Sequence, residues 1–223
     1  PSSIVNVFAA GTPRIDGAVT AVQAAAAATN TTTVTVTAEG AIQNGPQPVT
    51  YTFTRGGQPL AGCTNLTANK CTDQGATNGE TYIYEATVTT VFKGVSRTST
   101  PPKSSAPITP YGIPDPVAIS SVRASTYGRA QVTYTVPSSR GVGGVVRYAL
   151  SESGSPLTEA AANSSPFEFP ATQGGGTVYL WNCNASACSA PASASYQAYG
   201  YSDGPEIGLQ INGSQICVST WGA

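Results

Sequence analysis

Three segments of the chain share one pattern, and this pattern decides the fold. Residues 117–136 read VAISSVRASTYGRAQVTYTV: an apolar run, a Tyr-Gly turn, and a run in which Val and Tyr alternate with Thr. Residues 18–37 (AVTAVQAAAAATNTTTVTVT) and 206–220 (EIGLQINGSQICVST) repeat this plan around an Asn-Thr or Asn-Gly turn. Alternation with period two is typical of half-buried strands, and a turn between two such runs predicts a β-hairpin. The repetition predicts successive domains of one kind.

A Gly/Pro junction precedes each repeat, at residues 11–13, 111–114 and 204–205. Proline fixes φ and removes a backbone donor, so it ends a strand and stiffens a linker. The junctions predict four parts: the last strand of a preceding module or a linker at 1–15, a first domain at 16–112, a second domain at 113–204, and the start of an incomplete third module at 205–223.

Further short alternating runs lie inside the two complete domains. Residues 49–54 and 82–88 are examples in the first, and residues 145–150 and 178–181 in the second. Clusters rich in Gly, Asn and Ser separate these runs. Seven short strands with turns between them are typical of an antiparallel sandwich. The sequence therefore predicts an all-β chain of two tandem seven-stranded antiparallel β-sandwiches.

The composition argues against several classes of function. Only 9% of the 223 residues are charged and the formal net charge is −1, which excludes a basic surface for nucleic acid. No apolar run is long enough to cross a bilayer, so we expect no direct membrane insertion. The chain contains no His, so Ser-His-Asp and Cys-His arrangements are impossible within it. Asp115, Asp203 and Glu206 lie near junctions, but no calcium-binding loop surrounds them. We expect no catalytic residue, no cofactor and no metal.

The cysteines indicate the compartment. Cys63 and Cys71 flank one short loop, and Cys183 and Cys188 bracket another. Each pair has the spacing of a short disulfide in an oxidising compartment, whereas zinc sites usually combine close CxxC sets or add His. The disulfide interpretation is favoured over free or metal-binding thiols. Cys217 is left over, either buried as a thiol or paired with a cysteine outside this sequence.

Two short motifs resemble a known family. Residues 79–82 (GETY) and 176–179 (GTVY) resemble the Gly-x-x-Tyr entry into the sixth strand of fibronectin type III domains, of the kind found in tandem in secreted bacterial proteins. The resemblance covers residues 18 to about 203. It implies that the hydroxyls of Tyr82 and Tyr179 bond to backbone as tyrosine corners. The family's Trp in the second strand is missing, and Trp181 is expected to fill part of that core volume.

These observations predict a non-catalytic structural spacer or presentation module of a secreted or cell-surface multidomain protein, of bacterial origin. Neighbouring modules of the same chain are the expected partners. Two alternatives stay open: an adhesion or glycan- and cell-wall-binding module that contacts another protein or a surface glycan, and an accessory module of a polysaccharide-degrading enzyme. Aromatic residues near the linkers are expected either to pack between modules or to contact a partner: Tyr111, Tyr199, Tyr201 and Trp221.

Overall fold

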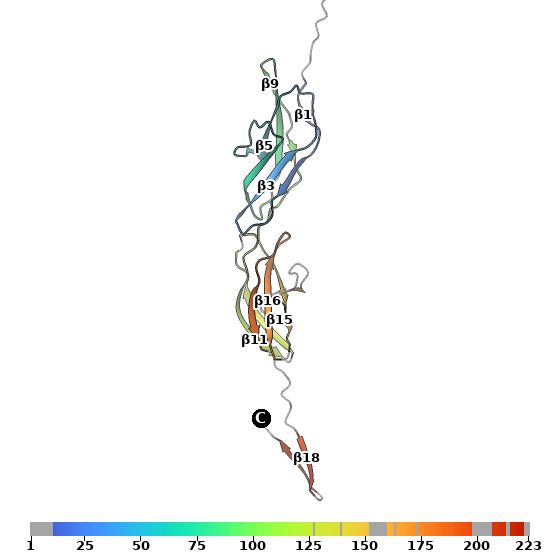
Figure 1. Cartoon of the computed structure of the whole chain (residues 1–223), viewed down its shortest axis with the longest axis vertical. Helices are drawn as coiled ribbons and strands as arrows, with labels where there is room; N and C mark the ends of the chain where they lie inside the picture. The colour runs from blue at the N-terminus through green and yellow to red at the C-terminus, as the bar shows by residue number, and fades with distance from the viewer. Residues whose placement is uncertain are drawn as a thin grey trace, which may run out of the picture. The chain divides into compact units, whose positions relative to one another are not determined.

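The computed structural model of the chain describes an all-β protein (Figure 1). The described residues are 11–126, 128–138, 140–151, 160–162, 164–172 and 174–197, together with the backbone of two strands at 207–212 and 215–220. No helix occurs within these ranges. Accordingly, the part of the chain that is described offers no helical segment with the length and apolar character of a membrane span.

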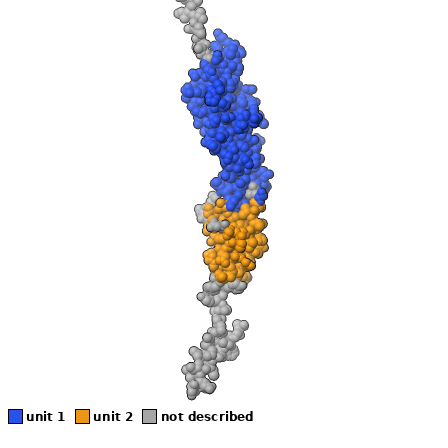
Figure 2. Space-filling model, turned by 180° about the vertical axis from the view of Figure 1, so that it is seen from behind, with its two compact units in different colours: residues 1–115, 138–144, 182–189 blue, residues 116–137, 145–181, 190–223 orange. Residues whose placement is uncertain are grey.

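The chain divides into two compact units (Figure 2). Unit 1 contains residues 1–115 together with the short segments 138–144 and 182–189. Unit 2 contains residues 116–137, 145–181 and 190–223. The first boundary thus lies at residue 115, whereas the sequence placed it at 112. The two short segments of unit 1 come from the part of the sequence assigned to the second domain.

Two sheets of antiparallel strands form unit 1. The first has the order β2-β3-β7 and the second the order β10-β8-β5-β6, with β9 also paired to β8. The strands are β2 (Val19–Gln23), β3 (Thr31–Ala38), β5 (Val49–Arg55), β6 (Gln58–Pro59), β7 (Lys70–Thr77), β8 (Tyr84–Phe92), β9 (Val95–Thr98) and β10 (Lys103–Ser104). A small pair joins β1 (Arg14–Ile15) to β4 (Ile42–Gln43).

The core of unit 1 follows from the alternation in its strands. Along β3 and β8 every second side chain is buried, so each strand offers one apolar face. Val34 and Val36 of one sheet and Phe53 and Tyr84 of the other belong to a single cluster of buried residues. Ile15 joins the same cluster. Residues 14–15 therefore belong to unit 1, although the sequence placed residues 1–15 outside the first domain.

Unit 2 also contains two sheets, one of three strands and one of four. One sheet has the order β11-β12-β15 and the other the order β14-β13-β16-β17. The strands are β11 (Ala118–Thr126), β12 (Arg129–Thr135), β13 (Val145–Ala149), β14 (Ala160–Ala161), β15 (Phe167–Pro170), β16 (Gly176–Cys183) and β17 (Ala192–Tyr196). Val132, Phe169 and Leu180 are fully buried between the two sheets.

The last strands, β18 (Ile207–Asn212) and β19 (Gln215–Thr220), form a separate antiparallel hairpin. This pairing agrees with the turn read at Asn212. The assignment of residues 205–223 to a third module stays a prediction. Tyr199, Tyr201 and Trp221 lie outside the described residues, and Cys217 lies on β19, of which only the backbone is described.

Candidate functional site

Both pairs of cysteines that the sequence singled out are joined by disulfides. Cys63 and Cys71 link the loop after β6 to β7, and Cys63 is fully buried in the core of unit 1. Cys183 and Cys188 close the loop of residues 184–187, which belongs to the 182–189 segment of unit 1. Each disulfide constrains a short loop in the unfolded chain as well as in the folded one.

Tyr82 lies where a corner tyrosine is expected. Its hydroxyl oxygen accepts a hydrogen bond from the backbone N–H of Thr77, five residues upstream, at 3.1 Å. Tyr82 precedes the buried Tyr84 by two residues, so the alternation of β8 turns both rings toward the same side. This bond fixes the crossing from β7 into β8.

Tyr179 takes a different position. It lies between the buried Val178 and Leu180 of β16, so its side chain points to the opposite face of that strand. There its ring stacks on Trp181 at 6.3 Å, and the described residues give its hydroxyl no hydrogen-bond partner. Trp181 is buried, but it lies outside the cluster of residues that forms the core of unit 2.

Tyr196 of β17 makes the backbone contact in unit 2 instead. Its hydroxyl accepts a hydrogen bond from the backbone N–H of Thr172 at 3.3 Å. Gly176 makes room for this ring, because a Cβ there would lie 2.8 Å from the Tyr196 hydroxyl. The glycine of the GTVY motif thus accommodates a tyrosine from the neighbouring strand, which explains why the motif does not place Tyr179 at the corner.

A polar cluster that the sequence did not reveal joins the two sheets of unit 1. Asp73 of β7 is buried and accepts hydrogen bonds from Arg55 Nη1 at 2.8 Å and from the Tyr84 hydroxyl at 2.9 Å. Its other oxygen accepts the backbone N–H of Gly75 at 2.9 Å. Burial and the bond to Asp73 raise the pKa of Tyr84, so this phenol stays neutral. In the sequence, this cluster could have been found only from Asp73 itself, a charged residue at an inward-facing position of a strand.

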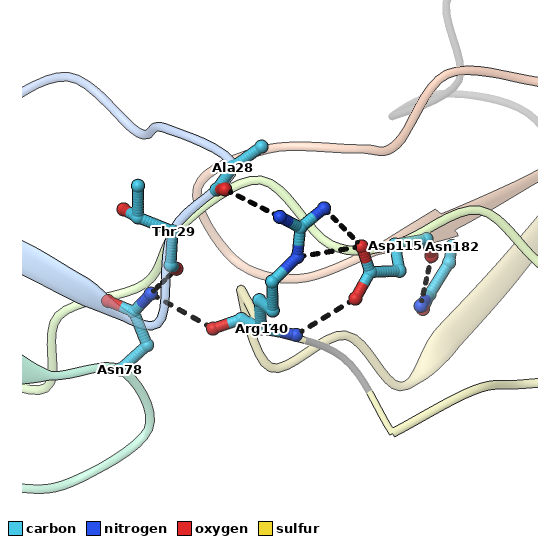
Figure 3. A network of polar contacts seen from close by, with 6 residues as sticks. All are labelled: Ala28, Thr29, Asn78, Asp115, Arg140 and Asn182. Carbon is cyan, nitrogen blue, oxygen red and sulfur yellow. Dashed lines mark hydrogen bonds and ion pairs between the residues drawn. The ribbon is translucent and has the colours of Figure 1, made fainter.

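A second polar network is centred on Arg140 in the 138–144 segment of unit 1 (Figure 3). The Arg140 guanidinium donates to Asp115 Oδ1 from Nη2 at 2.7 Å and from Nε at 3.0 Å, and its Nη1 donates to the carbonyl of Ala28 at 3.1 Å. The Arg140 backbone N–H also donates to Asp115 Oδ2 at 3.2 Å. These hydrogen bonds hold the pKa of the Asp115 carboxyl below its usual range, with the side-chain bonds as the largest cause. Asp115 is therefore engaged by an arginine.

Asn78 connects this network to the 24–30 loop. Its amide nitrogen donates to the carbonyl of Thr29 at 2.7 Å and to the carbonyl of Arg140 at 3.0 Å (Figure 3). Its oxygen accepts from the Thr32 hydroxyl. Asn78 is buried, so each of these bonds satisfies a group that water does not reach.

Two asparagines hold the 182–189 segment. Asn182 donates to the carbonyl of Asp115 at 2.9 Å, and Asn184 donates to the carbonyls of Gly112 at 2.8 Å and Gly141 at 2.9 Å. A glycine is required at position 141, because a Cβ there would lie 2.4 Å from the carbonyl carbon of Ile113. Side-chain amides and closely approaching backbone thus tie residues 112–115 to both short segments of unit 1.

Tyr111 lies in the stretch before this network. Its ring is half-buried, and its backbone N–H donates to Gln23 Oε1 of β2 at 3.1 Å. Tyr111 is therefore anchored to unit 1 through its backbone. Among the residues that the structure describes, no three His, Cys, Asp or Glu side chains gather in a way that would hold a metal ion.

Comparisons with known proteins give similarity of fold. No family model and no curated protein matches the chain. Solved structures similar to it include fibronectin(III)-like modules of CbhA from Clostridium thermocellum, with 16% identity over 82% of this chain and 94% of that one and a TM-score of 0.38. A two-domain fibronectin type III segment of chicken tenascin gives 15% identity over 79% and 97%, with a TM-score of 0.37. Immunoglobulin domains 1–5 of Sidekick-1 give 11% identity over 89% and 42%, with a TM-score of 0.47.

Similarities at this level carry no argument about activity or partners. The strand order is independent of them: a three-stranded sheet packs on a five-stranded sheet in unit 1 and on a four-stranded sheet in unit 2, in each case across one apolar core. This is the layered architecture shared by immunoglobulin and fibronectin type III domains. Each unit therefore has the fibronectin-type-III-like, immunoglobulin-like β-sandwich fold.

Proposed function

We propose that the chain is a non-catalytic structural spacer of a multidomain extracellular protein, which holds its neighbouring modules at a set distance. One observation carries the proposal. The 138–144 and 182–189 segments belong to unit 1, whereas the strands before and after each segment belong to unit 2. The chain therefore passes from one unit to the other after residues 115, 137, 144, 181 and 189. A single linker leaves two domains free to move, so a chain that passes repeatedly between its units supports a proposal of restricted motion.

The contacts that fix these segments suit such a role. Arg140 donates to both Asp115 and Ala28, and Asn184 donates to both Gly112 and Gly141. The Cys183–Cys188 disulfide closes the loop that presents Asn184. Disulfides persist in oxidising compartments, which supports an extracellular location. Because Arg140 and Asn184 each donate to two acceptors, several hydrogen bonds must break together before either segment can separate from unit 1.

The test is a distance measurement in the whole chain. Ser96 in unit 1 and Ser195 in unit 2 are both exposed, and each is replaced by a residue other than cysteine that carries a fluorophore. The spacer proposal predicts that single-molecule energy transfer gives one narrow distance population in the unmodified chain. The double variant Arg140→Ala/Asn184→Ala should broaden it.

The matched control is Arg123→Ala, which removes an exposed arginine bonded to Gln131 on the adjacent strand. This variant should leave the distance population unchanged. A broad population in the unmodified chain, or equal broadening by the control, would contradict the spacer role.

A further inference from the structure

A cavity in unit 1 lies between the edge strands of its two sheets. Its volume is about 530 Å³, and its walls come from the end of β5, from β6 and the loop that follows it, and from β7. Strand β6 is the last strand of one sheet and β7 the last strand of the other. The volume is within the range of small-molecule sites, which is roughly 300–1,000 Å³. Arg55 and Asp73 of the buried polar cluster both line it.

The guanidinium of Arg55 is held in place by hydrogen bonds that use only one of its nitrogens, Nη1. Its Nη1 donates to Asp73 at 2.8 Å and to the carbonyl of Gly75 at 3.1 Å, and its guanidinium carbon lies 4.7 Å from the centre of the Tyr82 ring. Both of these hydrogen bonds use Nη1, the guanidinium also acts on the nearby Tyr84 hydroxyl, and 32% of the side chain is exposed. A fixed guanidinium that is partly exposed matches a planar pair of acceptor oxygens.

Both oxygens of Asp73, the acidic partner of Arg55, accept hydrogen bonds. One oxygen of Asp73 accepts from Arg55 and Tyr84, and the other accepts from Gly75. Asp73 Oδ1 keeps one lone pair, but the side chain is only 7% exposed, whereas 32% of the Arg55 side chain is exposed. The exposed part of the charged pair is therefore mainly the arginine, which binds acceptors.

Polar side chains on the rest of the cavity wall are unused. Gln58, Thr72 and Gln74 are among the residues that line the cavity, and Thr72 and Gln74 are the exposed neighbours of the inward-facing Asp73 on β7. The side chains of all three are exposed and make no hydrogen bond with any described residue. Amides and a hydroxyl both donate and accept, which suits a ligand with several hydroxyl groups. Leu60 adds an apolar surface to the same wall. A carboxylate next to ring hydroxyls and an apolar ring face is the chemistry of an acidic sugar.

We propose that this cavity binds a carboxylate-bearing sugar residue of the uronic-acid class, with its carboxylate on the Nε and Nη2 edge of Arg55. The hydroxyls bond to Gln58, Gln74 and Thr72. The Arg55 charge is balanced by Asp73, so long-range attraction is small and the dissociation constant is on the order of 1 mM. This site is independent of the spacer role, since all of its residues lie on β5, β6 and β7 and in the adjoining loop.

The first experiment is an NMR titration of the whole chain with glucuronate, glucuronate methyl ester, glucose and acetate. We expect saturable shifts of the Arg55 Nε–H and the Gly75 N–H with glucuronate, and binding weaker by about fivefold or more with the other three probes. Equal binding of acetate would show a general carboxylate site, and equal binding of glucose or the ester would show that Arg55 does not read the carboxylate. Either result overturns the proposal, as does the absence of saturation.

The second experiment uses variants that preserve the fold. Gln58→Ala/Gln74→Ala removes two exposed side chains without internal hydrogen bonds, and we expect it to weaken glucuronate binding about fivefold. Arg55→Lys keeps a cation next to Asp73 but loses the two-pronged edge, and should weaken binding at least as much. The matched control is Arg97→Lys on the exposed strand β9. Unchanged binding in the double variant, or an equal loss in the control, would reject the site.

Discussion

The two units fill their interiors with different chemistry. Among the described residues, every buried polar or charged side chain belongs to unit 1: Thr32, Asp73, Asn78, Thr90, Ser99, Ser105, Asn182 and Ser189. The described interior of unit 2 contains an aromatic group, in which Phe169 lies 5.2 Å from Tyr196 and 6.3 Å from Tyr148, measured between ring centres. The same order of strands is thus compatible with two ways of specifying a core.

The difference has a physical consequence. Buried polar groups must be paired, so they impose one arrangement and penalise others strongly. Aromatic packing is governed by volume and shape, and it tolerates changes of charge elsewhere. We therefore expect unit 2 to be most sensitive to loss of volume and unit 1 to loss of a polar partner. Trp181 is buried in unit 2, so its fluorescence follows the unfolding of that unit.

The largest effect is expected for Phe169→Ala. Phe169 is fully buried among Tyr148, Phe167 and Tyr196, so its removal leaves a cavity. The expected loss in the free energy of unfolding of unit 2 is about 3–5 kcal/mol. Urea unfolding followed by Trp fluorescence measures it. The matched change in unit 1 is Phe92→Ala, at the half-exposed end of β8, and it should cost much less. Equal losses would show that the aromatic group is not what specifies unit 2.

The next effect tests the polar core of unit 1. Arg55→Ala leaves Asp73 buried without its cation, although Tyr84 and Gly75 still donate to it. Because Arg55 is partly exposed, we expect a loss of about 2–3 kcal/mol, below the cost of breaking a fully buried pair. Far-UV circular dichroism during urea unfolding should show the shift, while Trp fluorescence should not. Arg97→Ala, an exposed arginine on β9, is the control and should change little.

A smaller effect separates the three tyrosines. Tyr82→Phe and Tyr196→Phe each remove one hydroxyl that accepts a backbone N–H, and each should cost about 1 kcal/mol in its own unit. Tyr179→Phe removes a hydroxyl without a partner among the described residues and should cost less than about 0.5 kcal/mol. Thermal unfolding of the three variants ranks them. If Tyr179→Phe lowers the free energy of unfolding as much as Tyr196→Phe does, the Tyr179 hydroxyl makes a stabilising bond, as the sequence predicted for a tyrosine corner.

The alternation of apolar residues predicted the strands well, because burial of one face has period two in any sandwich. Residues 49–54 correspond to β5 (Val49–Arg55), and residues 145–150 correspond to β13 (Val145–Ala149). Both disulfides were also foreseen, since short loops between cysteines permit few other pairings. These features depend on residues that are close in sequence.

The polar contacts were not predicted, because they join residues that are far apart in sequence. Asp73 lies 18 residues from Arg55, and Arg140 lies 112 residues from Ala28. No local pattern encodes such a pairing. The motif at 176–179 failed for a related reason: its glycine accommodates Tyr196 from the next strand, and only the register between β16 and β17 shows this.

The smallest effect concerns pH and the Arg140 network. Arg140 holds the pKa of Asp115 below its ordinary value of 3.8, and both groups are exposed enough for solvent to screen the interaction. A folded-state pKa below the unfolded one stabilises the folded chain above the unfolded pKa, and this stabilisation disappears as the pH falls through the folded value. We expect Arg140→Gln to move the carboxyl titration of Asp115, followed by NMR, up toward 3.8. The stability difference between the two proteins should vanish in acid. A titration of Asp115 unchanged by Arg140→Gln would show that the side-chain ion pair does not act on this carboxyl, and that the Arg140 segment is held in unit 1 by its other bonds, which include those to Ala28, to Asn78 and from the Arg140 backbone N–H to Asp115.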